Sequence, residues 1–295
     1  MSSKFFAKTA VISGAAGGIG FALAQAFGRA GMNIVLADID KHQLRQASES
    51  LQGENIPVLA CELDVTDYDQ WLATIAAAED RFGEIHMLIN NAGVGGIPGS
   101  IEDTNHQTWR WVLDVNLMGV LYGAQAAIVA LKKHGHGGWI INVASMAGML
   151  GMPYAGAYCA SKAAVVSMTE SWAKELEPYN IKVSALCPAF VKTRIHQSGR
   201  NRQEQYQVSG AQSTNKAKAQ AGASKAAALV ESGIEAELLA SRVLEALETD
   251  QTYIFTHPNY RSVTADRAAA IDSAFVDAQN SPLVSHLQDQ DIAKL

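Results

Sequence analysis

Short apolar runs alternate with longer stretches of helical periodicity over most of the chain, and this alternation limits the possible folds more than any other feature. Six runs are short, rich in aliphatic or β-branched residues and bounded by turn formers, which predicts buried strands. The predicted strands are Thr9–Ser13, Asn33–Asp38, Pro57–Cys61, His86–Asn90, Trp139–Ala144 and Lys182–Cys187. The predicted helices between them span residues 18–30, 40–53, 67–82, 105–133 and 157–178. Because strands and helices alternate, we expect an α/β fold, a doubly wound parallel sheet with helices on both faces.

Residues 194–235 interrupt this rhythm. They are rich in Ala, Ser, Gln and Lys and contain one aromatic residue, Tyr206. We interpret the segment as a mobile lid over a binding site, with a passive surface insertion as the alternative. A further helix and a seventh strand, Thr252–Thr256, are predicted after it. We therefore expect a single domain over 1–256, into which the lid is inserted, and a polar, partly helical C-terminal extension over 257–295.

The composition argues against several classes of protein. A hydrophobic fraction of 48% over 295 residues excludes a mainly disordered chain, and a net charge of −6 without a Lys/Arg-rich run argues against a nucleic-acid partner. We expect no signal peptide and no membrane-spanning segment, which needs about 18 apolar residues, and hence a cytoplasmic location. The three cysteines, Cys61, Cys159 and Cys187, are too scattered for a disulfide framework or a zinc site, so no metal is predicted.

A glycine-rich turn follows the first predicted strand and leads directly into a helix. Gly14, Gly18 and Gly20 lie in this turn, where glycine lets the backbone approach a pyrophosphate group. The negative charge of that group would lie at the helix N-terminus, where backbone N–H groups are free. The turn therefore predicts a dinucleotide site of the Rossmann type, with an ordinary tight turn as the alternative.

Asp38 ends the second predicted strand, 18 residues after Gly20. An acidic side chain in this place can accept hydrogen bonds from the adenosine ribose hydroxyls of a dinucleotide. The alternative role for Asp38 is to cap the helix that begins near Asp40. Because a carboxylate repels a 2′-phosphate, and Gly17 and Ile39 offer no compensating cation, NAD is favoured over NADP.

Tyr158 and Lys162 are four residues apart in a predicted helix and therefore share one face. A nearby ammonium stabilises a phenolate and lowers the pKa of the phenol, which makes proton exchange with an alcohol feasible. Taken alone, the spacing of Tyr158 and Lys162 fits an exposed pair on a helix surface equally well. Ser145 follows the fifth strand, however, and the carboxyl ends of parallel strands meet at one edge of a sheet. Five residues that follow strands are expected to converge there: Gly14, Asp38, Asn90, Ser145 and Pro188.

Taken together, these residues resemble the short-chain dehydrogenase/reductase family, in the type that has a single Rossmann domain. The matching motifs are Ser13–Gly20 for the glycine turn, Asp64-Val65 for the adenine pocket, Asn90–Gly93 for the NNAG motif, Asn116 with Ser145, Tyr158 and Lys162 for the catalytic residues, and Pro188–Thr193 for the PG…T motif. Ala189 stands where the family has glycine in the last of these motifs. The resemblance covers residues 5–193 strongly and 234–256 loosely.

The resemblance implies NAD as the cofactor and a set of site residues. The implied cofactor-binding residues are Gly14, Gly18, Ile19, Gly20, Asp38, Asp64, Val65, Asn91, Ala92, Gly93, Tyr158, Lys162, Pro188, Val191 and Thr193. In the implied mechanism Tyr158 takes the proton of a secondary alcohol while hydride moves to NAD, and Ser145 positions the oxygen. Lys162 lowers the pKa of Tyr158 and holds the nicotinamide ribose, and the backbone of Asn116 holds a water that relays protons. The resemblance also implies a homodimer or homotetramer that pairs through residues 105–133 and 157–178.

The sequence says less about the substrate. Apolar residues flank the catalytic positions, which favours a bulky apolar or aromatic alcohol or ketone, unless several of them belong to the core. These residues are Met146, Met149, Leu150, Met152, Pro153 and Phe190. Two other functions remain open on the same scaffold, a lyase that has lost dinucleotide binding and a non-catalytic NAD-binding scaffold or sensor. The intact glycine turn argues against the first, and the filled catalytic positions argue against the second.

Overall fold

The computed structural model describes residues 4–207, 224 and 227–290. The chain divides into two compact units, one over Met1–Thr256 and one over His257–Leu295. The first unit holds the sheet and every predicted site residue, and the second holds one long helix.

Within the described residues, seven strands form one sheet in which every neighbouring pair is parallel. The strands are β1 Thr9–Ser13, β2 Asn33–Asp38, β3 Val58–Glu62, β4 Met87–Asn90, β5 Gly138–Val143, β6 Ile181–Cys187 and β7 Tyr253–Phe255. Their order is β3-β2-β1-β4-β5-β6-β7, so that β1 lies between β2 and β4. The strand order reverses at β1, and a ligand crevice is expected there, beyond the carboxyl ends of the strands. The predicted parallel α/β sheet is confirmed.

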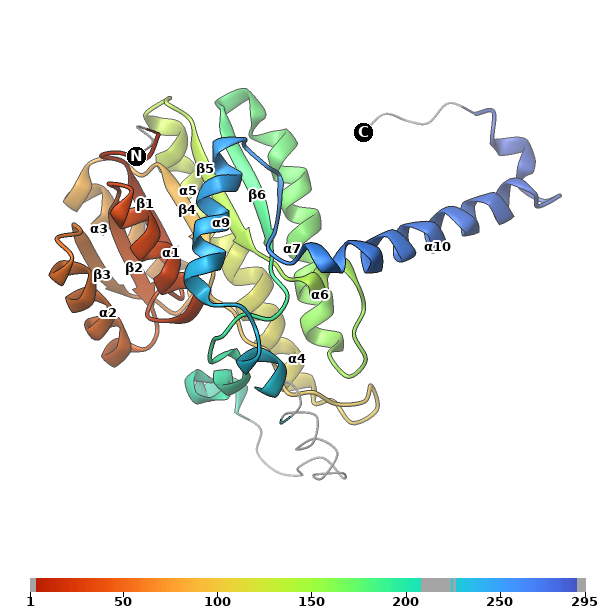
Figure 1. Ribbon diagram of the computed structural model, residues 1–295, viewed down its shortest axis with the longest axis horizontal. Coiled ribbons are helices and arrows are strands. Elements are labelled where there is room, and N and C mark those ends of the chain that lie inside the picture. The colour runs from red at the N-terminus through yellow and green to blue at the C-terminus, as the bar shows by residue number, and fades with distance from the viewer. Residues whose placement is uncertain (1–3, 208–223, 225–226, 291–295) are drawn as a thin grey trace. The chain divides into compact units, whose positions relative to one another are not determined.

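Helices cover both faces of the sheet (Figure 1). Among the described residues, the α-helices of the first unit include α1 Gly18–Arg29, α2 Lys41–Gly53, α3 Tyr68–Phe82, α4 His106–Leu113, α5 Gly119–Lys133, α6 Met146–Met149, α7 Gly156–Glu175 and α9 Ala236–Glu248. Alternate residues of β1 divide the core into two layers, because neighbouring side chains on a strand point to opposite faces. Ile12 packs in the layer with α1, α2 and α9, and Val11 packs in the layer with α3, α4 and α5.

Three local features differ from the sequence prediction. The predicted helix over 105–133 is α4 and α5 joined by a π-helical turn, Asp114–Met118. The four-residue helix α6 was not predicted, because it is too short to show a periodicity. The stretch His106–Lys133 is also long and apolar enough to cross a membrane by length and composition alone. The expectation that no segment of the chain meets this criterion is therefore corrected. Half of its most apolar window is buried inside the fold, as in the core helix of a globular protein.

The predicted lid over 194–235 leaves and rejoins the fold at neighbouring points. Val191 and Ile234 form a parallel bridge, and Lys192 N donates to Ile234 O at 3.0 Å. The lid residues 208–223 and 225–226 lie outside the described part of the chain. Its described first part contains two 3₁₀ turns, Ile195–Asn201 and Glu204–Tyr206.

The second unit contains the predicted helical portion of the C-terminal extension. Helix α10 runs over Arg261–Gln279 after a 3₁₀ turn at Pro258–Tyr260. None of the side chains of α10, all of which lie in the described range, is buried. Short 3₁₀ structure over Ser285–Leu287 follows it.

Candidate active site

Five of the predicted site residues lie at or just beyond the carboxyl ends of strands, at the same edge of the sheet. Because all of these strands are parallel, the loops after β1, β2, β4, β5 and β6 share the carboxyl edge. Asp38 and Asn90 are the last residues of β2 and β4, and Gly14, Ser145 and Pro188 lie in the loops after β1, β5 and β6. The structure therefore brings the predicted constellation together at the sheet edge where ligands of such folds bind.

The glycine turn is bonded to the loop after β4. Asn91 Nδ2 donates to the carbonyl oxygens of Ser13 and Gly14, both at 2.9 Å. In return, Ser13 Oγ accepts from the backbone N–H groups of Asn91 and Ala92, at 3.1 and 3.2 Å. The chain comes so close here that a Cβ on Gly14 would lie 2.7 Å from the Cα of Ala92. Ser13 therefore has a structural role in the site. Its position in the glycine motif marked it as part of the turn but did not indicate this role.

The turn presents a place for an anion at the start of α1. Gly17 stands at the cap position and has no side chain to satisfy the free N–H groups of the first helical turn. Gly18 has a φ of +54° and is exposed, and a Cβ there would lie 3.2 Å from Cγ2 of Thr193. Together with the helix dipole, this open backbone fits the pyrophosphate of a dinucleotide. The residues present thus fit a nicotinamide cofactor, with Thr193 on the opposite side of the turn.

Asp38 is bonded to the glycine turn as well as to its own loop. Its Oδ2 accepts from Ala16 N and its Oδ1 from Asp40 N, both at 3.0 Å. Burial raises the pKa of Asp38, and these two hydrogen bonds partly oppose that rise. The helix α2 is capped by Asp40, which accepts from Gln43 N at 3.1 Å. The alternative in which Asp38 itself caps that helix is therefore wrong.

The expectation that no cation lies near Asp38 is also wrong. Arg194 Nη2 lies 3.6 Å from the point that a Cβ on Gly17 would occupy. The charge of Arg200 acts on Asp38 and lowers the pKa of its carboxyl. Both arginines come from the lid segment, more than 150 positions from Asp38 in the sequence, so inspection of the neighbouring residues Gly17 and Ile39 could not reveal them.

The predicted adenine pocket is closed by a lid residue too. Both carboxylate oxygens of Asp64 accept from Gln203 Nε2, at 2.9 and 3.0 Å, and Oδ1 also accepts from Thr66. Val65 is buried, and its carbonyl accepts from Trp71 Nε1 at 3.2 Å. Gln203 is a residue that sequence reasoning missed, since no local pattern ties it to Asp64.

Tyr158 and Lys162 lie on α7 and face Ser145, which ends the loop after β5. Ser145 caps α6 by accepting from Ala147 N at 3.1 Å, and it forms a side-chain hydrogen bond with Tyr158. Lys162 is 3% exposed, and its Nζ donates to Val143 O at 2.7 Å and lies 5.8 Å from the centre of the Tyr158 ring. The predicted Ser-Tyr-Lys arrangement is thus assembled by two elements, the end of β5 and the first turns of α7.

Burial controls the ionisation of both α7 residues. It raises the pKa of Tyr158, and the hydrogen bond with Ser145 opposes that rise. Burial likewise lowers the pKa of Lys162 to about 8, although the nearby Cys187 opposes the change. The direction for Tyr158 is opposite to the lowering expected from Lys162, because the loss of solvation is the largest influence on the phenol. Lys162 therefore loses its proton more readily than an ordinary lysine.

Asn116 occupies the π-helical turn between α4 and α5. Its amide group is bonded on both sides, since Oδ1 accepts from Val94 N at 2.8 Å and Nδ2 donates to Val94 O at 2.9 Å and to Ser161 Oγ at 3.2 Å. A Cβ on Gly93 would lie 3.4 Å from Asn116 Oδ1 and 3.5 Å from Lys162 Nζ, so these three residues are neighbours. A π turn alters the regular i→i−4 backbone pairing and is frequent at functional sites. The side chain of Asn116 is therefore structural, and its backbone is the part available for a relay.

The loop after β6 closes the other side of the site. The carbonyl of Pro188 accepts from Met146 N at 2.8 Å and from Ser145 Oγ at 3.4 Å. Val191 is buried and forms the bridge to Ile234 that joins the two ends of the lid segment. Thr193 Oγ1 accepts from Ile195 N at 3.4 Å. The three predicted residues of this loop therefore lie between Ser145 and the glycine turn.

Comparison with known proteins agrees with this arrangement. Residues 8–204 match the model of the short chain dehydrogenase family. The chain is 40% identical over 199 residues to the trans-4-hydroxycyclohexanecarboxylate dehydrogenase of Sinomonas cyclohexanicum, which covers 65% of this chain and 76% of that protein. It is 31% identical over 276 residues to the C alpha-dehydrogenase of Sphingobium sp. (strain NBRC 103272 / SYK-6), with 93% and 88% covered. A crystal structure of a short chain dehydrogenase/reductase from Burkholderia phymatum in complex with NAD superposes with a TM-score of 0.88 at 33% identity, over all of both chains.

The family match covers two thirds of the chain and includes the glycine turn, Asp64, Asn116 and the residues of α7. The chain belongs to the short-chain dehydrogenase/reductase family. It is accordingly an oxidoreductase that binds a nicotinamide cofactor. The predicted family membership is confirmed, and the geometry above shows which parts of the chain build the site.

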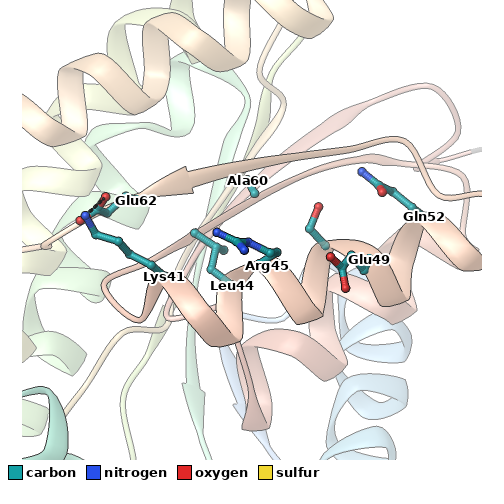
Figure 2. Close-up of a pocket in the computed structure, with 8 residues that line it drawn as sticks. Lys41, Leu44, Arg45, Glu49, Gln52, Ala60 and Glu62 are labelled. Atoms are coloured by element: carbon teal, nitrogen blue, oxygen red, sulfur yellow. Dashed lines mark ion pairs between the residues drawn. The ribbon is translucent and has the colours of Figure 1, made fainter.

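A separate surface groove of this dehydrogenase reaches the carboxyl end of β3, where Glu62 pairs in register with Asp38. It is formed between α2 and the edge strand β3, and Figure 2 shows the side chains of α2 in a row beside Ala60. Lys41 and Glu62 form an ion pair of 2.8 Å across one end of it. Charged side chains beside an edge strand oppose pairing with other chains. The groove contains none of the predicted catalytic residues, and we assign it no role in binding the cofactor.

Proposed function

We propose that this dehydrogenase interconverts a secondary alcohol and a ketone with NAD(H). The observation that carries the proposal is the grouping of Ser145, Tyr158 and Lys162 beside an uncapped glycine turn, at the shared carboxyl edge of the sheet. Bound NAD supplies the hydride acceptor for alcohol oxidation, and NADH supplies the hydride for the reverse reaction. The protein supplies the binding site, the orientation of the reactants and the proton transfer.

The side chains divide the proton chemistry among them. Tyr158 Oη accepts the proton of the substrate hydroxyl during oxidation and returns it during reduction. Ser145 Oγ, which already bonds to Tyr158, holds the substrate oxygen beside it. The positive charge of Lys162 favours the phenolate form of Tyr158, and the backbone of Asn116 in the π turn passes the proton onward through water.

We propose NAD as the preferred cofactor. Asp38 stays the main argument, because its carboxylate lies at the end of β2 and would repel a 2′-phosphate. The Burkholderia phymatum structure, which contains NAD and matches the whole chain, supports this choice. Arg200 weakens the repulsion, so we expect a preference for NAD over NADP and not an exclusion of NADP.

The substrate class that fits best is a bulky, mainly apolar secondary alcohol. Two loops, of which the second leads into the first turn of α7 and Tyr158, expose large apolar side chains, Ile97 at 58%, Ile101 at 79% and Tyr154 at 66%. The loops are joined by a hydrogen bond of 3.0 Å from Gly99 N to Tyr154 O. Exposed apolar groups beside a polar catalytic centre indicate a substrate with an apolar body and a single reacting oxygen. The relative from Sinomonas cyclohexanicum is named for a substrate whose hydroxyl stands on a cyclohexane ring, which is a secondary alcohol.

The flanking residues that had suggested this pocket do not all line it. Met146 is 4% exposed and belongs to the buried core, which was the alternative for that set. Met149, Leu150, Met152 and Phe190 are half-buried, and Pro153 is exposed. The argument for an apolar substrate therefore now depends more on Ile97, Ile101 and Tyr154.

The experiment that tests the proposal is NADH formation at 340 nm with a panel of secondary alcohols of small aliphatic, aromatic and steroid types. We expect turnover of a bulky member with NAD and slower turnover with NADP. Faster turnover of the small aliphatic alcohols would refute the substrate class. Product formation without NADH would indicate a lyase, and cofactor binding without turnover of any substrate would indicate a scaffold or sensor.

A further inference from the structure

The first described part of the lid, residues 194–206, lies along the cofactor half of the crevice. Gly95 N donates to Ser198 Oγ at 3.2 Å, which ties this segment to the loop after β4. Gln203 Nε2 donates to Asp64, which ties it to the loop after β3. Because the loops after β3 and β4 border the predicted adenosine site, we name residues 194–206 the cofactor clasp.

Side chains of α4 and the π turn hold the clasp from a third side. Trp111 Nε1 donates to Gln203 Oε1 at 3.0 Å, and Tyr206 Oη donates to an Asp114 carboxylate oxygen at 2.9 Å. Tyr206 is 7% exposed, and the Arg202 guanidinium stacks on Trp111 with 4.9 Å between the guanidinium carbon and the ring centre. The clasp is therefore fixed by bonds to elements of the main fold. A side chain that it directs at the crevice is positioned in advance of binding.

Arg194 is the charged residue of the clasp that reaches the glycine turn. Its Nη2 lies 3.6 Å from the point that a Cβ on Gly17 would occupy. Its backbone carbonyl accepts from Gln197 N at 2.9 Å and from Arg200 Nη1 at 3.2 Å, so the base of the side chain is held in place. No carboxylate in the described part of the chain lies within ion-pair distance of its guanidinium. By contrast Lys192, two residues earlier, is paired with Glu235.

We propose that Arg194 is a cofactor-binding residue whose guanidinium binds the pyrophosphate of the nicotinamide cofactor across the glycine turn from the N-terminus of α1. This inference rests on the proposed function, because it takes a dinucleotide as the ligand. A pyrophosphate carries two negative charges, and the planar fork of a guanidinium can donate two hydrogen bonds to it. The N–H groups at the start of α1 contact only one side of such a group. Arg194 stands on the other side of Gly17 and can neutralise the charge that remains.

The clasp directs its bonding groups at the cofactor half of the crevice and not at the catalytic residues. A substrate lid would carry its bonding groups toward Tyr158 and Ser145, whereas the clasp carries Arg194 and Gln203 toward Gly17 and Asp64. The clasp thus acts on the cofactor, and a mutation of Arg194 or Gln203 should affect cofactor affinity.

The test compares cofactor binding by Arg194→Gln, Arg194→Lys and the control Lys192→Gln with that of the wild type. NADH binding is followed by fluorescence, and ADP-ribose, which keeps the pyrophosphate but cannot accept hydride, is titrated by calorimetry. Loss of one charge-assisted contact at a partly exposed site should raise the Kd of Arg194→Gln for both ligands about tenfold. Arg194→Lys should fall between that variant and the wild type, since it keeps the charge and loses the fork. Lys192→Gln removes the same charge from the same loop and should change either Kd less than about twofold.

Three results would overturn a specific part of the argument. If the wild type bound neither NADH nor ADP-ribose, the proposed function itself would fail. If the wild type bound both and Arg194→Gln bound them equally well, only the role of Arg194 would be refuted. If Arg194→Gln weakened the binding of NADP while NADH and ADP-ribose were unaffected, the guanidinium would contact the 2′-phosphate and the assignment to the pyrophosphate would be wrong. Thermal unfolding of each variant checks that the exposed Arg194 side chain can be replaced without loss of the fold.

Discussion

Substitution of Gly14 by alanine should damage both the stability of the fold and the cofactor site, and the structure offers a matched control. Gly14 has a φ of +62°, and its added Cβ would lie 2.7 Å from Ala92 Cα and 2.9 Å from Asn91 Nδ2. Gly135 has a φ of +72°, and no neighbouring group of the described structure lies within 4 Å of its added Cβ. Both substitutions therefore force an L residue into the left-handed region, but only Gly14→Ala also creates a steric clash.

The two effects can be given approximate sizes. The left-handed conformation costs an L residue about 1–2 kcal/mol, and this cost is common to both variants. The clash at Gly14 is with backbone of the loop after β4, which Asn91 holds by two hydrogen bonds, so neither side can move freely. Overpacking of this kind costs about 1–3 kcal/mol. We expect Gly135→Ala to lower the free energy of unfolding by about 1–2 kcal/mol and Gly14→Ala by about 2–5 kcal/mol.

The assay is urea unfolding followed by circular dichroism, together with NADH titration of each folded variant. Relaxation of the clash at Gly14 must displace either the glycine turn or Ala92, so the affinity for NADH should fall in that variant and stay unchanged in Gly135→Ala. Equal destabilisation by the two substitutions would show that the close approach of Gly14 and Ala92 has no energetic weight. A Gly14→Ala variant with normal NADH affinity would show that the turn does not position the cofactor.

Three further predictions concern proton transfer, cofactor choice and the pH dependence of stability. Tyr158→Phe should abolish turnover and leave the Kd for NAD within a few-fold, and near-normal kcat in steady-state assays would disprove its role in proton transfer. Asp38→Ser combined with Ile39→Arg should move the ratio of kcat/KM values toward NADP, and an unchanged ratio would mean that Asp38 does not select the cofactor. The pKa of His86 is lowered mainly by burial and next by His134, so the folded state binds fewer protons than the unfolded state just below pH 6.5. The free energy of unfolding should therefore decrease as the pH falls through that value. Urea midpoints at pH 7.5 and 5.5 measure this decrease, and His86→Gln should make the decrease smaller.

The order of strands and helices was predictable because each strand carries its own local signal. Runs such as Asn33–Asp38 are buried on both faces of a parallel sheet and therefore consist of aliphatic residues, which a sequence shows directly. The glycine turn was predictable for a related reason, since glycine is favoured where φ is positive or where the backbone approaches another chain segment closely, as at Gly14. Convergence of Gly14, Asp38 and Ser145 then follows from parallel topology alone.

The sequence by itself thus determined the parallel α/β sheet, the family, and which side chains stand at the carboxyl edge. Only the tertiary structure decided how those side chains are bonded and charged. It placed Arg194 at the glycine turn and Gln203 on Asp64, and it raised the pKa of Tyr158 where the pairing with Lys162 had indicated the opposite. The physical reason is that strand formation depends on residues that are neighbours in the sequence, whereas solvation and charge depend on all residues that are neighbours in space. In this chain the lid brings such neighbours from more than 130 positions away.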